Sequence, residues 1–345
     1  MKKFIIKTLF FTVPFFLLYT FNFLMYKNND GDLARIGYFY SNPSPKELQI
    51  NKYSLKRKYV SVSDLNLNTN NNFEVLNIGD SYSEQDSLSY LNFLVHQNVS
   101  VLHYNRTSSV DNNIQQLIDL TNGNFFESNK VNYVVLQCGE RMFIKRTMDL
   151  QFNKVTNIDS LIKLQKIKKF VNEDNKIDFF SDAMFKIPLT NLEYLFKDKP
   201  IYSDTYKVES NKNDLFTNNP NSILFFRDDI DYLYLNNVKE NIDKANFEIN
   251  KINSILNKKN IKLILMIPPD KYSLYYKFIK NKNGYTKPQF FNYFNQLKKD
   301  YIYIDSYSSL SKAIENGKDV YYYDDTHWSP LGAKIVANEL KLLIK

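Results

Sequence analysis

Two short stretches, far apart in the 345-residue chain, carry residue types that together could perform covalent catalysis. The first is Gly-Asp-Ser-Tyr-Ser at residues 79–83, which contains Ser81. The second contains His327, with Asp325 two residues and Asp324 three residues before it. A serine becomes a nucleophile when a histidine takes its proton, and a carboxylate on the other ring nitrogen stabilises the imidazolium. The sequence therefore predicts a Ser81–His327 pair completed by Asp325 or Asp324.

Each stretch also has a simpler interpretation. Gly79 could make a turn in which Asp80 or Ser81 only caps a helix, as such residues often do. His327 could be a surface histidine that precedes a helix. The two motifs together favour the catalytic interpretation, because the chain has only 3 histidines and one stands beside two carboxylates.

The elements around Ser81 would position it well for this chemistry. Residues 73–78 have the apolar, β-branched pattern of a buried strand, and a helical pattern runs from Glu84 to Gln97. Ser81 would then lie at a strand-to-helix turn, where its own N–H and others that open the helix could stabilise a negative oxygen.

Alternating strand and helix patterns predict the fold class. A parallel sheet covered by helices on both faces is expected, that is, a doubly wound α/β domain. The final helix should be capped by Ser329, with Pro330 at its first position. The predicted strands are 73–78, 99–104, 131–138, 262–267 and 301–304, and the other helices are 112–120, 238–258, 288–299 and 308–316. Residues 145–233 break the alternation and predict an inserted subdomain of mixed structure.

The N-terminus predicts a membrane anchor. Residues 8–26 carry no charge and would span roughly 28 Å as a helix, close to the thickness of a bilayer core. Lysines at positions 2, 3 and 7 predict that the N-terminus is cytoplasmic and that the rest is extracytoplasmic. A cleaved signal peptide is the alternative, but small residues suited to cleavage are missing after the apolar run. We expect an anchor at 1–26, a tether and packing segment at 27–72, and a catalytic domain at 73–345.

Composition narrows the class of protein. The net charge of +8 comes from 45 basic residues spread among 37 acidic ones, so no basic tract predicts a nucleic-acid partner. The single cysteine, Cys138, cannot form an internal disulfide. No metal-ligand cluster, nucleotide loop or dinucleotide fingerprint is present in the sequence, and no cofactor is expected.

Four motifs carry a resemblance to a known family. Gly-Asp-Ser at 79–81 and Asp-Thr-His-Trp at 325–328, just before a C-terminal helix, resemble the SGNH (GDSL-type) hydrolase superfamily. Within it, they look like the DHHW-type branch related to the alginate O-acetylation proteins. The strand ending in Glu-Arg at 134–141 and Pro-Pro-Asp-Lys-Tyr at 268–272 are similar to further blocks of that branch. The resemblance covers residues 73–141 and 260–345, and it implies a flavodoxin-like sheet.

The resemblance also implies roles for individual residues. Ser81 would be the nucleophile and His327 its base, and the acid would be Asp325 by the narrower branch or Asp324 by the wider superfamily. The superfamily's second-block glycine and third-block asparagine have no counterparts, so the oxyanion donors expected are the Ser81 N–H and Asn105. Arg141 would bind substrate, brace its loop or form a structural salt bridge with Glu140 or another acid.

Trp328 would line a sugar-binding cleft or pack against the last helix. The activity implied is transfer or hydrolysis of an acyl group, expected to be acetyl, on a cell-surface polysaccharide through an acyl-serine. The implied partner is a membrane-bound O-acyltransferase that donates the acyl group. The alternative is an inactive scaffold or glycan-binding protein that keeps the sheet without the chemistry.

Overall fold

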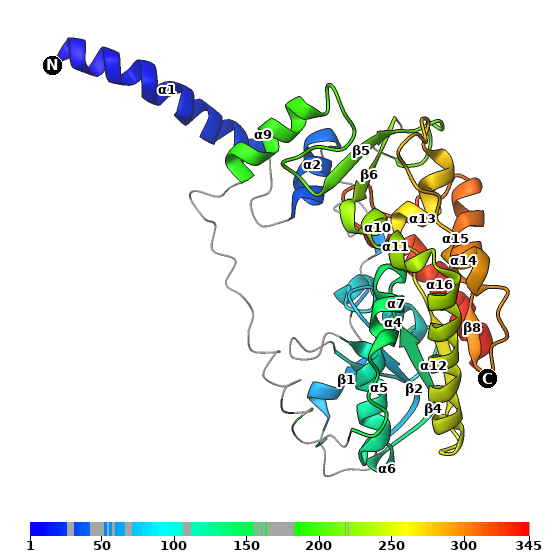
Figure 1. Cartoon of the computed structure of the whole chain (residues 1–345). Helices are drawn as coiled ribbons and strands as arrows, with labels where there is room; N and C mark the ends of the chain where they lie inside the picture. The colour runs from blue at the N-terminus through cyan, green and yellow to red at the C-terminus, as the bar shows by residue number, and fades with distance from the viewer. Residues whose placement is uncertain are drawn as a thin grey trace.

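The computed structural model describes most of the chain, and the elements it contains are labelled in Figure 1. The described residues are 1–25, 31–41, 52–53, 55–56, 59–65, 71–105, 112–154, 157, 160, 163, 183–217, 219 and 221–344.

A six-stranded sheet forms the centre of the molecule, in the order β1-β3-β2-β4-β7-β8, with every neighbouring pair parallel. Apart from the edge strand β1, this is the 2-1-3-4-5 order of flavodoxin-like sheets. The predicted α/β fold is therefore confirmed. The strands are β1 (Val60–Ser61), β2 (Asn71–Ile78), β3 (Val101–Tyr104), β4 (Asn129–Gln137), β7 (Lys262–Met266) and β8 (Ile302–Ile304).

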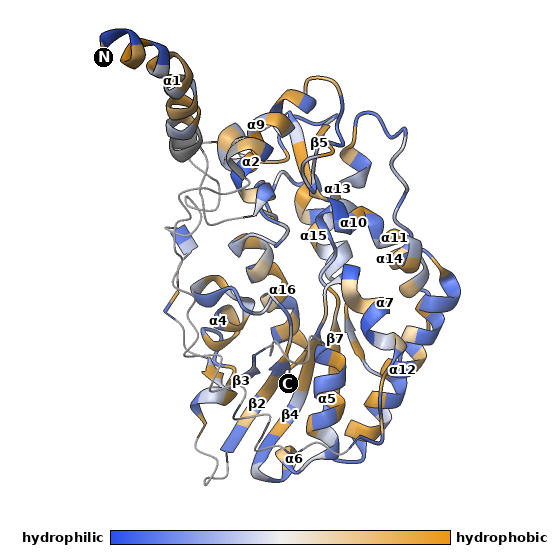
Figure 2. Ribbon diagram, turned by 60° about the vertical axis from the view of Figure 1, so that its left-hand side comes forward, coloured by the Kyte–Doolittle hydropathy of each residue, from blue (hydrophilic) through white to orange (hydrophobic). Residues whose placement is uncertain are grey.

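Alternate residues of the central strands enter two separate cores, one on each face of the sheet. Val75 and Val135 belong to the core covered by α4 (Tyr90–Val95), α15 (Ser306–Glu315) and α16 (Pro330–Leu343). Leu76 and Val134 belong to the opposite core. Helices α5 (Asn113–Asn122), α7 (Glu140–Met148), α12 (Lys239–Asn257) and α14 (Phe290–Phe294) cover that second face. Figure 2 shows the apolar strands enclosed between these helices.

The register of the strands sets up one edge of the sheet for chemistry. Ile78 at the end of β2 pairs with Tyr104 of β3 and with Leu136 of β4. The loops that follow these three strands therefore leave the sheet side by side. Parallel α/β sheets commonly bind ligands at this carboxyl edge.

Most predicted boundaries lie within a few residues of the observed ones, and two helices are exceptions: the one predicted at 84–97, which is described with the site below, and the one predicted at 288–299. Helix α14 covers only Phe290–Phe294, and residues 295–297 continue in turns. The last helix begins as expected: Pro330 is its first residue, and the Ser329 side chain accepts a hydrogen bond from the Gly332 N–H. The remaining short elements are η1 (Val62–Asp64), η2 (Asp86–Leu88), α6 (Phe125–Ser128), α13 (Lys271–Tyr275) and η3 (Tyr276–Phe278).

The region predicted as an insertion, 145–233, contains its own small structure. Strands β5 (Thr205–Glu209) and β6 (Ser222–Phe226) pair antiparallel. Helix α9 (Ala183–Glu193) precedes them, and α10 (Arg227–Asp231) and α11 (Leu233–Asn236) follow. Helix α2 (Asp32–Tyr40) packs against α9, β5 and β6. Most of residues 155–182 lie outside the described part.

Helix α1 (Lys2–Met25) projects from the rest of the molecule, as Figure 1 shows. Its segment Lys2–Phe21 has a mean hydropathy of 1.8, and none of it is buried in the protein. This helix is long and apolar enough to cross a membrane.

Candidate active site

Ser81 lies in a tight turn directly after β2. The Ser83 N–H donates to the Asp80 carbonyl, which closes the turn over Ser81 and Tyr82. The helix predicted to start at Glu84 is not present there. Asp86 adopts a left-handed backbone with φ of 44°, which an α-helix cannot continue through, and α4 begins only at Tyr90. Ser81 therefore lies in a turn and not at a helix N-terminus.

The Ser81 hydroxyl group contacts the loop that precedes α16. Ser81 Oγ lies 2.7 Å from Nε2 of His327, and Nδ1 of His327 lies 2.6 Å from Oδ1 of Asp325. These side chains come from positions 246 residues apart. The His327 and Asp325 side chains are 22% and 21% exposed, so the histidine can be reached from solvent.

Asp325, and not Asp324, accepts the hydrogen bond from the imidazole. Asp325 also accepts from the His327 backbone N–H at 3.2 Å, which fixes the carboxylate against the ring. Asp324 is 5% exposed and packs on the N-terminal helix α2. A Cβ atom at Gly37 would lie 2.2 Å from Cβ of Asp324, so glycine is needed for this approach.

Aromatic contacts tie the two loops together. The Tyr82 hydroxyl donates to the Thr326 carbonyl at 3.0 Å. The Tyr82 ring also lies edge-on to the rings of His327 and Trp328, with centroids 4.8 and 4.9 Å away. Since Tyr82 follows Ser81 directly, its contacts with Thr326 and His327 help to hold the serine close to the histidine.

A buried carboxylate, Asp80, holds the Ser81 turn to the sheet. It accepts hydrogen bonds from the Gln137 side chain at 2.7 Å, the Gly139 N–H at 2.8 Å and the Arg146 guanidinium at 3.0 Å. Burial alone would raise the pKa of Asp80, but the Arg146 charge and these donors outweigh it and lower the pKa below its ordinary value. Asp80 is therefore a structural anion, and Ser81 is the member of the motif whose side chain contacts His327.

A buried cation, Lys271, holds the His327 loop. Its Nζ donates to the carbonyls of Tyr323 at 2.7 Å and Asp325 at 3.1 Å, and the residue is fully buried. Burial lowers the pKa of Lys271 to about 8, against the opposing effect of Asp324 and Asp325. We did not predict this role from the sequence, although Lys271 stands in the Pro-Pro-Asp-Lys-Tyr block.

Glu140 links the elements behind the two loops. Its carboxylate accepts from the Asp270 N–H at 2.8 Å and from the Ser273 hydroxyl at 2.7 Å. Burial raises the pKa of Glu140 to about 7. The start of α7 is thereby joined to α13, the helix that carries Lys271.

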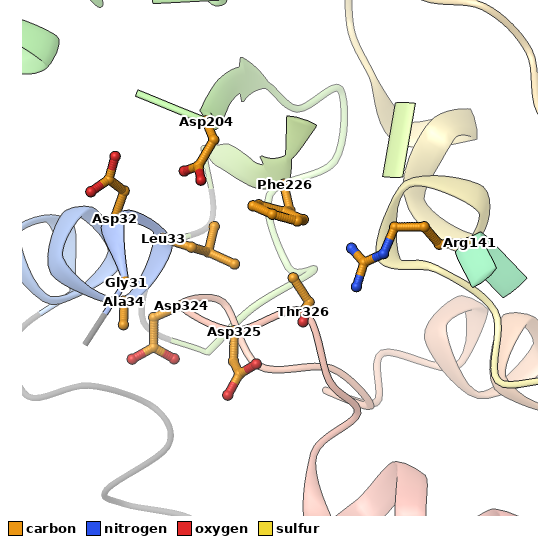
Figure 3. A pocket seen from close by; sticks show the side chains of 10 residues that line it. All are labelled: Gly31, Asp32, Leu33, Ala34, Arg141, Asp204, Phe226, Asp324, Asp325 and Thr326. Carbon is orange, nitrogen blue, oxygen red and sulfur yellow. The ribbon is translucent and has the colours of Figure 1, made fainter. Parts of the chain in front are cut away.

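An open pocket of about 310 Å³ adjoins this site. Figure 3 shows Arg141 and Thr326 on one side, Asp325 below, and Leu33 and Phe226 in the middle. Arg141 forms an ion pair of 2.5 Å with Asp229, so its salt bridge is not with Glu140. Its side chain remains 24% exposed and lines the pocket, which leaves it available to a ligand.

Residues 220–345, which include this histidine loop, match the family model described as the SGNH hydrolase-like domain of the acetyltransferase AlgX. This part of the chain is similar to SGNH hydrolase-like domains. The predicted resemblance to that superfamily, and to its alginate O-acetylation branch, is thereby confirmed. No curated protein matches the chain. Ser81 lies outside the matched residues, so its place in this SGNH-like site depends on the geometry above.

Two residues predicted to bind substrate or oxyanion make other contacts instead. The Asn105 amide donates to Ser61 Oγ at 2.9 Å, and Ser61 is on β1, which flanks β3 on the side opposite β2. Trp328 is fully buried between Tyr82 and Tyr90, with its ring edge-on to both. The SGNH-like site therefore uses Trp328 for packing, since its neighbours leave no surface for a sugar.

Of the two oxyanion donors predicted, only the Ser81 amide stays a candidate. Within the described ranges, its N–H donates to no protein acceptor. The Tyr82 N–H, by contrast, donates to Oδ1 of Asp80 at 3.3 Å. Among the same residues, no group of three or more His, Cys, Asp or Glu side chains is arranged to hold a metal ion.

Proposed function

We propose that this protein is a membrane-anchored, extracytoplasmic O-acyltransferase or esterase that works through an acyl-Ser81 intermediate. The observation that carries the proposal is the chain of hydrogen bonds from Ser81 through His327 to Asp325, at 2.7 and 2.6 Å. A hydroxyl, an imidazole and a carboxylate in this order form the arrangement that activates serine nucleophiles.

The first half-reaction follows from these contacts. Ser81 Oγ attacks the carbonyl carbon of an acyl ester while its proton passes to Nε2 of His327. Asp325 stabilises the imidazolium, and the Ser81 N–H donates to the oxygen that becomes negative. His327 then protonates the departing oxygen, the ester bond breaks, and the acyl group remains on Ser81.

The second half-reaction decides between transferase and esterase. His327 takes a proton from the incoming hydroxyl, whose oxygen attacks the acyl-Ser81 carbonyl, and the serine leaves with the proton. A sugar hydroxyl gives transfer, whereas water gives hydrolysis. The AlgX match favours a polysaccharide hydroxyl as acceptor and acetyl as the group. The partner proposed is a membrane-bound O-acyltransferase that supplies the acyl group.

Membrane anchoring is proposed from α1. Its lysines at positions 2, 3 and 7 precede the uncharged stretch, which favours a cytoplasmic N-terminus. The domain that follows would then face the compartment in which surface polysaccharides are modified.

The decisive experiment compares wild type with Ser81→Ala, using Ser254→Ala on the exposed face of α12 as a matched control. We expect a fluorophosphonate probe to label wild type and Ser254→Ala equally, and to leave Ser81→Ala unlabelled. Surface-glycan acetylation in cells that carry each form should follow the same order. Labelling of Ser81→Ala at the wild-type rate would contradict the proposal.

One observation favours the alternative, an inactive scaffold or glycan-binding protein. The Asn105 amide donates to Ser61, and the Gly139 N–H donates to Asp80, so neither of these groups is aimed at an oxyanion. Wild-type protein that binds acetylated glycan, but neither reacts with the probe nor changes acetylation, would support this alternative.

A further inference from the structure

Helix α9 and the turns after it expose an unusual amount of apolar surface. After residue 25, twelve large apolar side chains are exposed among the described residues, and seven of them fall between residues 185 and 202. We call these seven the α9 face: Phe185, Leu189, Leu192, Leu195, Phe196, Ile201 and Tyr202. Concentration in one short segment distinguishes this face from scattered surface residues, which need no explanation.

The exposed side of α9 is opposite a well-packed one. Ile187 and Thr190 are fully buried. Ile187 belongs to the same hydrophobic core as Val75 and Val135 of the central sheet. Phe185, Leu189 and Leu192 follow the spacing of one helical face and are 50%, 42% and 58% exposed. Helix α9 therefore exposes apolar side chains on one side while its other side is packed against the protein.

The α9 face lies beside the candidate membrane helix. Helix α9 contacts both α1 and α2, and Figures 1 and 2 show α9 next to the end of α1. Six chain links connect Met25, where α1 ends, to Gly31, which precedes α2. Those links reach at most about 20 Å. If α1 spans a bilayer, α2 and the helix packed on it must stay near the bilayer surface.

The polar residues around the face suit a headgroup region. Lys197 pairs with Glu193 at 2.6 Å, and its side chain is 39% exposed. Phe196 beside it is 88% exposed. Aromatic and lysine side chains are typical of the boundary between lipid and water, where rings enter the acyl region and ammonium groups remain at the headgroups.

We propose that the α9 face is inserted in the interfacial layer of the same bilayer that α1 crosses. This inference rests on the proposed anchoring by α1. Its consequence concerns the pocket, because Leu33 of α2 lines it and α2 contacts α9. Phe226, which also lines the pocket, is on β6, and β6 contacts α2. Two attachments, one spanning and one lying flat, would fix the pocket close to the membrane surface.

The test uses the full chain in vesicles of phosphatidylcholine and phosphatidylglycerol, with no other protein. An environment-sensitive fluorophore is attached at Phe196→Cys, and the matched control is Phe247→Cys on α12, where the natural residue is 66% exposed. Cys138 does not compete for the label, because it is buried and burial raises the pKa of its thiol to about 12. Doxyl-labelled phosphatidylcholine then serves as the quencher.

We expect at least twofold stronger quenching at position 196 than at position 247. Equal quenching at the two positions, in protein that floats with the vesicles, overturns the inference and leaves the anchor intact. A fluorophore at 196 that is shielded from water but not quenched by lipid also overturns it, in favour of a second copy of the chain. If the full chain does not float with the vesicles, both the proposed anchoring by α1 and this inference are wrong. Labelling of Ser81 tests the proposed chemistry separately.

Discussion

The two loops that meet at the candidate active site are held in opposite ways. The Ser81 turn is held by a buried anion, Asp80, which receives N–H donors from β4 and its following loop. The His327 loop is held by a buried cation, Lys271, which donates to backbone carbonyls of that loop. Asp80 has a full counter-charge in Arg146 at 3.0 Å, whereas the hydrogen-bond acceptors of Lys271 are neutral.

Because of this difference, substitutions at Asp80 and at Lys271 should affect different properties of the protein, its stability and its activity. Removing one member of a buried ion pair leaves the other charge uncompensated, which costs folding free energy. Removing a buried cation from neutral acceptors costs less, but it frees the carbonyls that place Asp325. We therefore expect changes at Asp80 to destabilise the fold, and changes at Lys271 to slow the reaction at Ser81.

The largest effect should come from within the His327 loop itself. Asp325→Asn should slow Ser81 labelling about 10⁴-fold, or about 5.4 kcal/mol of activation free energy, because an amide that donates to Nδ1 leaves Nε2 protonated and unable to accept. Asp324→Asn should change the rate less than about tenfold, because its carboxylate does not bind the ring. Labelling rates of the purified variants provide the measurement. A reversed order would reassign the acid to Asp324.

Asp80→Asn should come next, and its effect should be on folding. The free energy of unfolding should fall by about 3–5 kcal/mol, because Arg146 stays buried without its counter-charge. Asp214→Asn is the control: its pair with Lys212 is exposed and should contribute less than about 1 kcal/mol. Denaturant unfolding in detergent measures both. Equal midpoints for the two variants would show that Asp80 does not hold the turn.

The pH dependence of Asp80 sharpens the same point. Its pKa in the folded protein lies below the ordinary value of 3.8. The stabilisation it provides is therefore complete above the ordinary pKa and is lost as the pH falls through the folded value. Asp80→Asn should lack this acid-dependent loss.

Lys271→Met should have the smallest effect and the most selective one. Ser81 labelling should slow by about 10–100-fold, since a displacement of the base of about 1 Å costs rate in this range, while stability should change little. Lys299→Met is the control, because Lys299 also donates to two carbonyls, those of Phe294 and Leu297, but outside the site. Wild-type activity should fall as the pH rises through about 8, where Lys271 loses its proton. This fall should be missing in Lys271→Met; a profile that keeps it would assign the titration to another group.

The sequence predicted most of what depends on local pattern. Strands β4 and β7 are each predicted by a short apolar run, and α12 by apolar residues at helical spacing. These patterns lie within short stretches of the sequence, so they can be recognised without a structure. The geometric pairing of Ser81 with His327 was predictable because both ends carry distinctive motifs. The choice between Asp324 and Asp325 was not, since it depends on how Gly37, almost 290 residues earlier in the chain, packs against the loop.

Other features depend on contacts that no local pattern contains. The turn after Ser81 was predicted as a helix start, and the left-handed backbone of Asp86 prevents it. Lys271 lies in a stretch used only for resemblance, and its role appears only when α13 meets the His327 loop. The sequence did not decide whether Trp328 lies on the surface or in the core, because its burial depends on contacts with Tyr82 and Tyr90.

Helix α2 has a consequence for any shortened version of the protein. Residues 31–34 form one wall of the pocket, and Gly37 supports the backbone of Asp324. A soluble form of the protein obtained by removing α1 must therefore keep the chain from Gly31 onward. Cutting at the start of β2 would spare every strand of the main sheet except β1, yet it would remove the residues of α2 that form this wall of the pocket.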